Sequence, residues 1–86
     1  MKPQPKTPKQ PQPVELQALH QLYQSGRLQQ AEVQARALLG AYPKAPVLYN
    51  IIGLCQQGQG RLRDAAASFR KLLAIAPNHP VFRLAY

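Results

Sequence analysis

The feature that most constrains this chain is an internal repeat with an offset of 34 residues. Identical residues recur in one phase without a gap, at Gly26-Arg27-Leu28 and Gly60-Arg61-Leu62, Ala31 and Ala65, Leu38-Leu39 and Leu72-Leu73, and Pro43 and Pro77. A fixed period of this length is typical of proteins that stack copies of one supersecondary unit. The sequence therefore predicts two such units in succession.

Each unit has the hydrophobic spacing of amphipathic helices. Leu19, Leu22 and Tyr23 lie at i, i+3 and i+4, and the pattern breaks at a glycine and then resumes. Proline follows the second apolar segment, where it ends a helix, and a further proline stands at the start of the next unit. The pattern predicts helices at 14–25, 28–41, 46–58 and 62–75, and a fifth that begins at residue 80.

The segment 1–13 differs in composition from the rest of the chain. It reads MKPQPKTPKQPQP and holds five of the nine prolines, with no large apolar residue after Met1. Such a segment has no apolar face whose burial could offset the conformational entropy that it would lose on folding. We predict a mobile, polyproline-like arm at 1–13 and a helical domain at 14–86, in which repeat one is 12–45, repeat two is 46–79 and a truncated repeat three is 80–86.

Length and composition exclude several classes of protein. With 86 residues the chain forms one small domain at most, and no apolar stretch reaches the length of a membrane span. A single cysteine excludes an internal disulfide framework. No apolar run of signal-peptide length follows the basic N-terminus, so a cytoplasmic location is expected.

The second unit, 46–79, resembles a tetratricopeptide repeat (TPR). In its first helix it has an aromatic residue, Tyr49, and the pair Ile52-Gly53, where the helices of a repeat cross. Gly60 stands in the turn. The second helix has a small residue, Ala65, with the aromatic Phe69 one turn later, and the unit ends at Pro77-Asn78. The first unit, with Gly26, Ala31 and Pro43, is degenerate, because Glu15 replaces the first aromatic residue, Leu19 the crossing glycine and Ala35 the second aromatic residue. The resemblance covers 12–86. It implies an all-α fold of antiparallel helix-turn-helix repeats in a right-handed solenoid.

The resemblance also implies a concave groove lined by the first helix of each unit. The residues at groove positions are Leu16, His20, Tyr23 and Gln24 in the first unit and Asn50, Leu54 and Gln57 in the second. A groove of this kind suits an extended or helical peptide of another protein. The asparagine with which many relatives hold a peptide backbone is replaced by Ile51 and Gln17, so that ligand mode does not carry over.

Residues that could carry chemistry are few. Cys55 lies on the inner face of a predicted helix and is expected to be a buried, inert thiol, although a dyad with His20 is an alternative. His79 falls in a predicted turn, and the spacing of His20, Cys55 and His79 does not fit a metal site. We therefore predict no enzymatic activity, no cofactor and no metal within these residues.

The charge is strongly positive, with 11 Lys and Arg against 3 Asp and Glu, a net charge of +8. Arg61, Arg63, Arg70 and Lys71 gather on one predicted helix, where a solvated outer face is the favoured interpretation. A nucleic-acid surface would combine basic residues with exposed aromatic rings, and the aromatic residues here match core or groove positions. Binding of nucleic acid is thus less favoured than binding of protein.

Three functions stay open at this stage. The first is a peptide-binding scaffold, the second is a non-catalytic TPR segment of a larger enzyme such as a transferase, and the third is a basic nucleic-acid adaptor. The third repeat stops after two turns at Tyr86, which we interpret as the end of an N-terminal piece of a longer protein. We expect Val81, Phe82, Leu84 or Ala85 to fold back on the second unit, with weak self-association through this C-terminal end.

Overall fold

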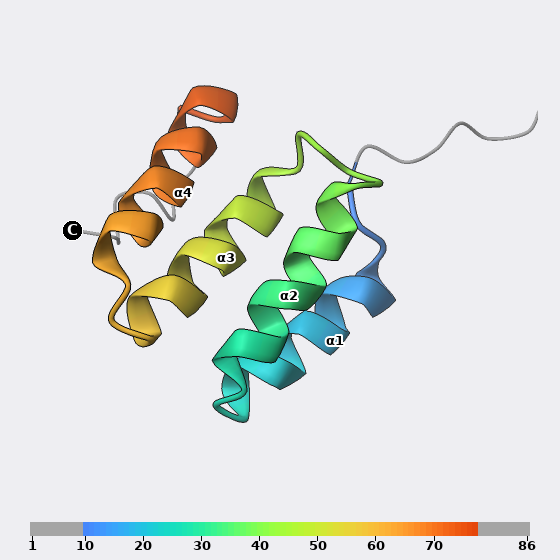
Figure 1. Ribbon diagram of the computed structural model, residues 1–86. Coiled ribbons are helices and arrows are strands. Elements are labelled where there is room, and N and C mark those ends of the chain that lie inside the picture. Colours follow the sequence, from blue (N-terminus) through green and yellow to red (C-terminus); the bar gives the residue numbers. More distant parts are fainter. Residues whose placement is uncertain (1–9, 78–86) are drawn as a thin grey trace, which may run out of the picture.

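The computed structural model describes residues 10–77, which form four helices (Figure 1). They are α1 (Pro13–Gln24), α2 (Leu28–Leu39), α3 (Pro46–Gly58) and α4 (Leu62–Ile75). All four helices predicted within this range are confirmed, although α1 begins and ends one residue earlier than expected and α2 ends two residues earlier. Most of the predicted arm, at 1–9, and the predicted fifth helix from residue 80 lie outside the described residues.

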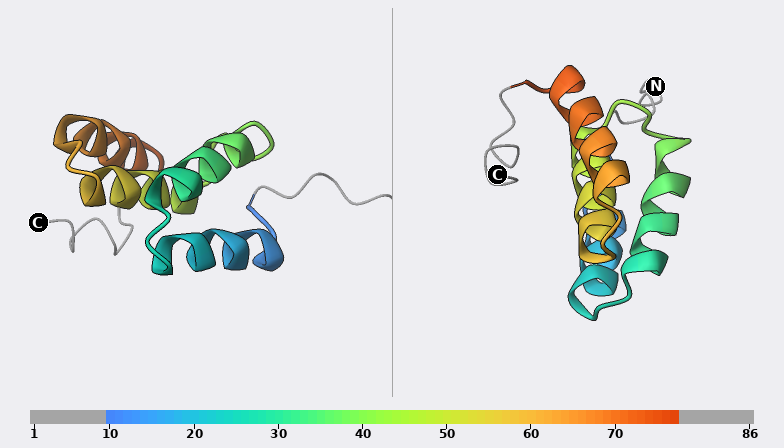
Figure 2. Two further views of the ribbon diagram at one scale, coloured as in Figure 1. Left: turned by 60° about the horizontal axis from the view of Figure 1, so that its bottom comes forward. Right: turned by 60° about the vertical axis from the view of Figure 1, so that its left-hand side comes forward.

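The helices form two hairpins, α1 with α2 and α3 with α4. α3 packs between α2 and α4, whereas α1 packs mainly against α2. The left view of Figure 2 shows α1 and α3 on one side of the molecule and α2 and α4 on the other. The two first helices therefore share one face and the two second helices share the opposite face.

The last residues of the predicted arm, 1–13, belong to the described structure. Pro11 is buried, and Pro13 is the first residue of α1, where its missing N–H costs no hydrogen bond. The backbone N–H of Gln12 donates to Oε1 of Glu15 at 2.8 Å, which fixes the start of the helix. The end of the proline-rich segment is thus part of the folded structure.

The two hairpin turns have the same backbone geometry. Gly26 has a φ of 81° and Gly60 a φ of 79°, the left-handed region that only glycine adopts at low cost. In both turns the following arginine donates its N–H to a carbonyl five residues earlier, at 2.9 Å. The repeat in sequence is therefore also a repeat in local structure.

The Gly60→Ala variant should lower the free energy of unfolding by about 1 kcal/mol. No atom lies within 4 Å of the added methyl group, so the loss comes from backbone strain alone. Gly26→Ala should cause a similar loss, because its φ and its surroundings are the same. Chemical denaturation of both variants measures this, and no loss in either would contradict the left-handed turns.

The core has two parts. The larger cluster joins α1, α2, α3 and the turn before α3, and its members are Leu19, Ala31, Ala35, Tyr42, Ala45, Leu48, Ile51, Ile52 and Cys55. The smaller cluster belongs to α4, with Ala65, Phe69 and Leu72, against which Tyr49 and Leu54 pack. Because α3 contributes to both, it connects the two hairpins.

The glycine at the crossing of α3 and α4 faces an aromatic ring. A Cβ at Gly53 would stand 2.7 to 3.0 Å from three ring carbons of Phe69. The ring of Phe69 therefore lies directly against Gly53. In the first unit the sizes are exchanged, since Leu19 replaces this glycine and Ala35 replaces the phenylalanine, and both are buried.

Candidate partner-binding surface

The residues predicted to line a groove lie on α1 and α3. Their exposure differs. His20, Gln24 and Gln57 are exposed, Leu16, Tyr23 and Leu54 are half-buried, and Asn50 is buried. The three half-buried residues also pack against the core clusters. This set of residues combines half-buried apolar side chains with exposed polar ones, and we call it the first-helix face.

Asn50 is the unusual residue of the first-helix face. Asn50 is only 9% exposed. Its side-chain oxygen, Oδ1, has no hydrogen-bond partner among the residues that the structure describes. A buried acceptor without a partner costs about 1–3 kcal/mol in the free protein. That cost is removed when a bound group donates a hydrogen bond to the oxygen.

The Asn50→Leu variant should therefore be more stable than the parent chain, by about 1 kcal/mol. Leucine has nearly the shape of asparagine and carries no acceptor to leave unpaired. Thermal and chemical denaturation measure the change. A loss of stability instead would show that Asn50 makes structural hydrogen bonds, and it would remove the reason for placing a ligand there.

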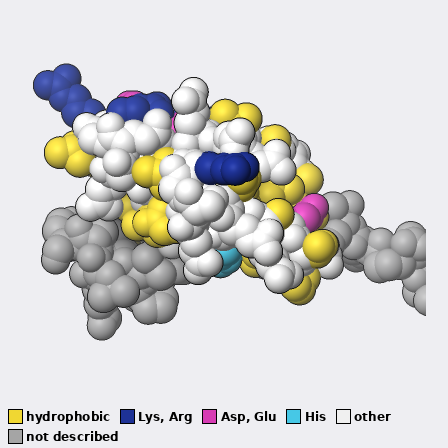
Figure 3. Space-filling model, turned by 90° about the horizontal axis from the view of Figure 1, so that it is seen from below, with side chains coloured by type: hydrophobic (Ala, Val, Ile, Leu, Met, Phe, Trp, Pro, Cys, Tyr) yellow, Lys and Arg dark blue, Asp and Glu magenta, His cyan; other side chains and the backbone are white. Residues whose placement is uncertain are grey.

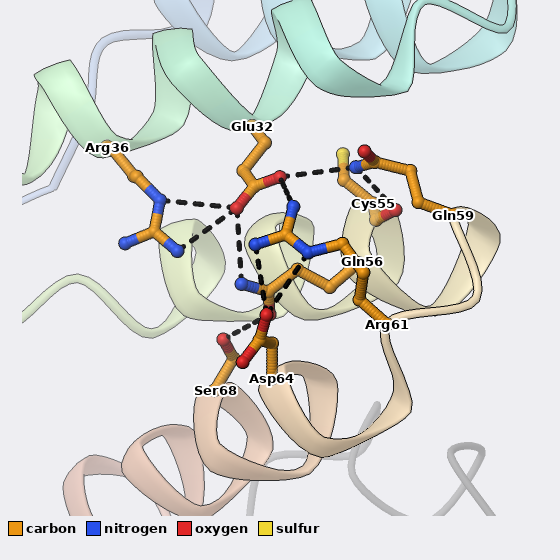
Figure 4. Close-up of polar contacts among 8 residues, drawn as sticks. All are labelled: Glu32, Arg36, Cys55, Gln56, Gln59, Arg61, Asp64 and Ser68. Carbon is orange, nitrogen blue, oxygen red and sulfur yellow. Dashed lines mark hydrogen bonds and ion pairs between the residues drawn. The ribbon is translucent and has the colours of Figure 1, made fainter.

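A buried carboxylate, Glu32, lies at the junction of the two hairpins (Figure 4). Residue Glu32 is 4% exposed. Its Oε2 accepts from Arg36 at 3.0 Å and from the Gln56 amide at 3.2 Å, and its Oε1 accepts from Arg61 at 2.8 Å and Gln59 at 3.2 Å. Helices α2, α3 and α4 are thereby held to one acidic group.

The network continues beyond Glu32. The hydroxyl of Ser68 donates to Oε1 of Gln56 at 2.6 Å, and Arg61 also pairs with Asp64 at 3.0 Å. Burial by itself would raise the pKa of Glu32, but the hydrogen bonds from Arg36, Gln59, Arg61 and Gln56 outweigh it and the pKa is lowered. The carboxylate is therefore ionised at neutral pH and fully used in holding the hairpins together.

The Glu32 network adds a contact that the prediction about the basic residues did not include. Arg61, Arg63, Arg70 and Lys71 are exposed as expected, but the side chain of Arg61, which is 42% exposed, also pairs with Glu32. Sequence reasoning missed Glu32 itself. The available signal was its spacing of four residues from Arg36, which favours an ion pair on one helix.

Cys55 is buried, as predicted, and its surroundings oppose the thiolate. Burial, with the negative charge of Glu32 nearby, raises the pKa of the Cys55 thiol to about 11. His20, the residue considered as its base, is exposed. Within residues 10–77, no three histidine, cysteine or acidic side chains come together as metal ligands would.

All three carboxylates of the chain are engaged in internal contacts. Glu15 caps α1, Glu32 holds the junction and Asp64 pairs with Arg61. Seen from below the view of Figure 1, apolar side chains reach the surface beside lysine and arginine (Figure 3). The outer charge of the described residues is therefore predominantly positive.

The comparisons with known proteins add no assignment. No family model matches the chain, and no curated protein sequence or solved structure is significantly similar to it. None of the four helices that the structure describes is long and apolar enough to cross a membrane. Functional inference therefore depends on the geometry described above.

Proposed function

We propose that this chain is a protein–protein interaction module of the helical-repeat kind, which binds a peptide segment of a partner on the first-helix face. The proposal depends chiefly on Asn50, whose buried Oδ1 has no partner within residues 10–77. A backbone or side-chain N–H of a bound segment would supply the missing hydrogen bond. The resemblance of the second unit to a TPR favours the same face.

The rest of the face fits such a ligand. Half-buried Tyr23 and Leu54 offer apolar surface that a ligand would cover further, while exposed His20 and Gln57 offer polar contacts at its edge. Apolar floors with polar margins are typical of binding surfaces. Binding at the first-helix face would thus cover apolar surface and would also give the unpaired Oδ1 of Asn50 a hydrogen bond.

A selection experiment tests this function. A phage-displayed library of random 16-residue peptides is panned on the full chain, and the best peptide is measured by fluorescence anisotropy on the parent and on Asn50→Leu. We expect binding to Asn50→Leu to be at least about tenfold weaker, although that variant is predicted to be more stable. The combination of weaker binding and higher stability separates a ligand contact from a structural role.

The control is Arg70→Leu, a change of a polar side chain to leucine at an exposed position of α4. It should bind the selected peptide within about twofold of the parent. If Asn50→Leu binds as well as the parent, or if Arg70→Leu loses as much affinity, the first-helix face is not the binding site. Failure to select any peptide would count against the function as a whole.

A further inference from the structure

The N-terminal edge of the first hairpin is an uncovered copy of the surface by which the second hairpin packs on the first. The clearest sign is Leu48, which is 0% exposed at the junction, whereas its repeat equivalent Val14 is 71% exposed at the edge. Ile52 at the junction is 2% exposed, and its equivalent Ala18 is exposed at the edge. Surface that is covered in one unit is thus open in the other.

Two hollows lie along this edge and share Leu22. One, of about 470 Å³, is lined by Ala18, Gln21, Leu22, Ser25 and Arg27. The other, of about 460 Å³, is lined by Leu22, Gln29, Gln30, Val33 and Gln34, and Val33 is 59% exposed. Neither lining contains an acidic residue. We call the two hollows together with Val14 the N-terminal edge.

Arg27 and Arg61 occupy equivalent places in the two units. Each is the residue before the second helix, with φ and ψ of −87° and 65° for Arg27 and −89° and 73° for Arg61. Arg61 binds Glu32 at 2.8 Å across the junction. Arg27 forms no ion pair with any carboxylate in residues 10–77, and all three carboxylates of the chain are already engaged.

We propose that the N-terminal edge binds an amphipathic helix of another protein, which presents a carboxylate to Arg27 as α2 presents Glu32 to Arg61. The occupant is a helix because a helix, α2, covers the equivalent surface of the second unit. It is acidic because the edge offers an arginine and no carboxylate, so the charges are complementary. This surface is separate from the first-helix face, and the proposal does not depend on the function proposed above.

A second copy of the chain is a poor occupant. In the second unit Ala66 replaces Glu32 and Arg70 replaces Arg36, so a second copy that stacked by α4 would offer no carboxylate at the place of Glu32. It would bring a cation toward Arg27 instead. The partner is therefore a different chain that carries an acidic residue at this place.

The probe for the test is a fluorescein-labelled peptide of residues 27–41, stapled between positions 30 and 34 so that it stays helical. It carries Glu32 and the face with which α2 covers the second hairpin. Binding to the full chain is followed by anisotropy, and backbone amide shifts of the labelled chain locate the site. We expect saturable binding, with the largest shifts at Ala18, Leu22 and Val33.

A charge exchange identifies the contact. Arg27→Glu should weaken binding of the probe at least tenfold, and a probe with Glu32→Arg should recover most of that loss on the Arg27→Glu chain. Lys44→Glu is the matched control, since Lys44 is exposed at the opposite end of α2, and it should change binding less than twofold. Val33→Gln, which leaves all charges intact, should also weaken binding several-fold.

Three results would overturn the proposal. The first is the absence of binding at millimolar peptide. The second is equal loss in Arg27→Glu and Lys44→Glu, which would indicate general attraction to a basic surface, as for nucleic acid. The third is a shift map centred on Leu62 and α4 or on the first-helix face.

Discussion

Gly53→Leu is expected to lower the free energy of unfolding by about 3 kcal/mol or more, which is most of the stability of a domain of this size. The first carbon of the new side chain would already stand 2.7 Å from the ring of Phe69. The ring is itself buried and cannot move aside without breaking its own packing. Thermal melting followed by circular dichroism measures the loss.

The first unit shows how the crossing can be repaired. It holds Leu19 and Ala35 at the places of Gly53 and Phe69, both buried in the larger cluster. The double variant Gly53→Leu with Phe69→Ala should therefore be more stable than Gly53→Leu alone, and also more stable than Phe69→Ala alone, which should cost about 3–5 kcal/mol. Additive losses in the double variant would show that the two crossings are not equivalent.

Gly58→Ala serves as the control for this crossing. Its added methyl group would meet a terminal carbon of Leu28 at 2.6 Å, the end of a flexible side chain that is only half-buried. We expect a loss of about 1 kcal/mol, since Leu28 can change rotamer. A loss as large as that of Gly53→Leu would mean that a side chain at either glycine of α3 is equally destabilising. The contact with Phe69 would then not explain the effect at Gly53.

Glu32→Gln is expected to lower the free energy of unfolding by about 2–3 kcal/mol. Removal of one partner from a buried ion pair costs about 3–5 kcal/mol, but water can reach Arg36 and Arg61, whose side chains are 54% and 42% exposed, and this reduces the loss. Asp64→Asn removes an exposed partner from the same Arg61, and should cost less than about 1 kcal/mol. Equal losses in the two variants would contradict the junction role of Glu32.

The same residue should make stability depend on pH. The pKa of Glu32 is lowered in the folded chain from an ordinary value of 4.5, so the unfolded chain takes up the proton at higher pH. Stability should be full above pH 4.5 and should fall as the pH drops through the lowered pKa. The Glu32→Gln variant should lose this part of the pH dependence, and an unchanged acid profile would show that other groups cause it.

The repeat pattern predicted the four helices within one or two residues, because each hairpin turn contains a glycine and the first helix of each unit begins with a proline. The pattern did not predict the role of Glu32, because this residue is not repeated. Its counterpart in the second unit is Ala66. The partners Gln56, Gln59 and Arg61 lie 24, 27 and 29 residues away on other helices or in the turn between them. Contacts over such separations follow from packing rather than from local pattern.

The groove predicted at these residues stays a prediction. The spacing of His20, Gln24 and Gln57 predicted one face for them, and the structure shows that all three are exposed. Asn50 occupied a groove position in the prediction, but no pattern in the sequence indicated that its oxygen would be buried without a partner. That property depends on how closely α3 is surrounded, which hydrophobic periodicity does not report.

The most direct test of the central claim is a map of backbone amide shifts for the labelled full chain during titration with the selected 16-residue peptide. If the first-helix face binds the partner, the largest changes will occur at His20, Tyr23, Asn50 and Gln57, with little change at Arg63 and Arg70 on the outer side of α4. Changes confined to α4, with none on α1 and α3, would contradict the proposed function.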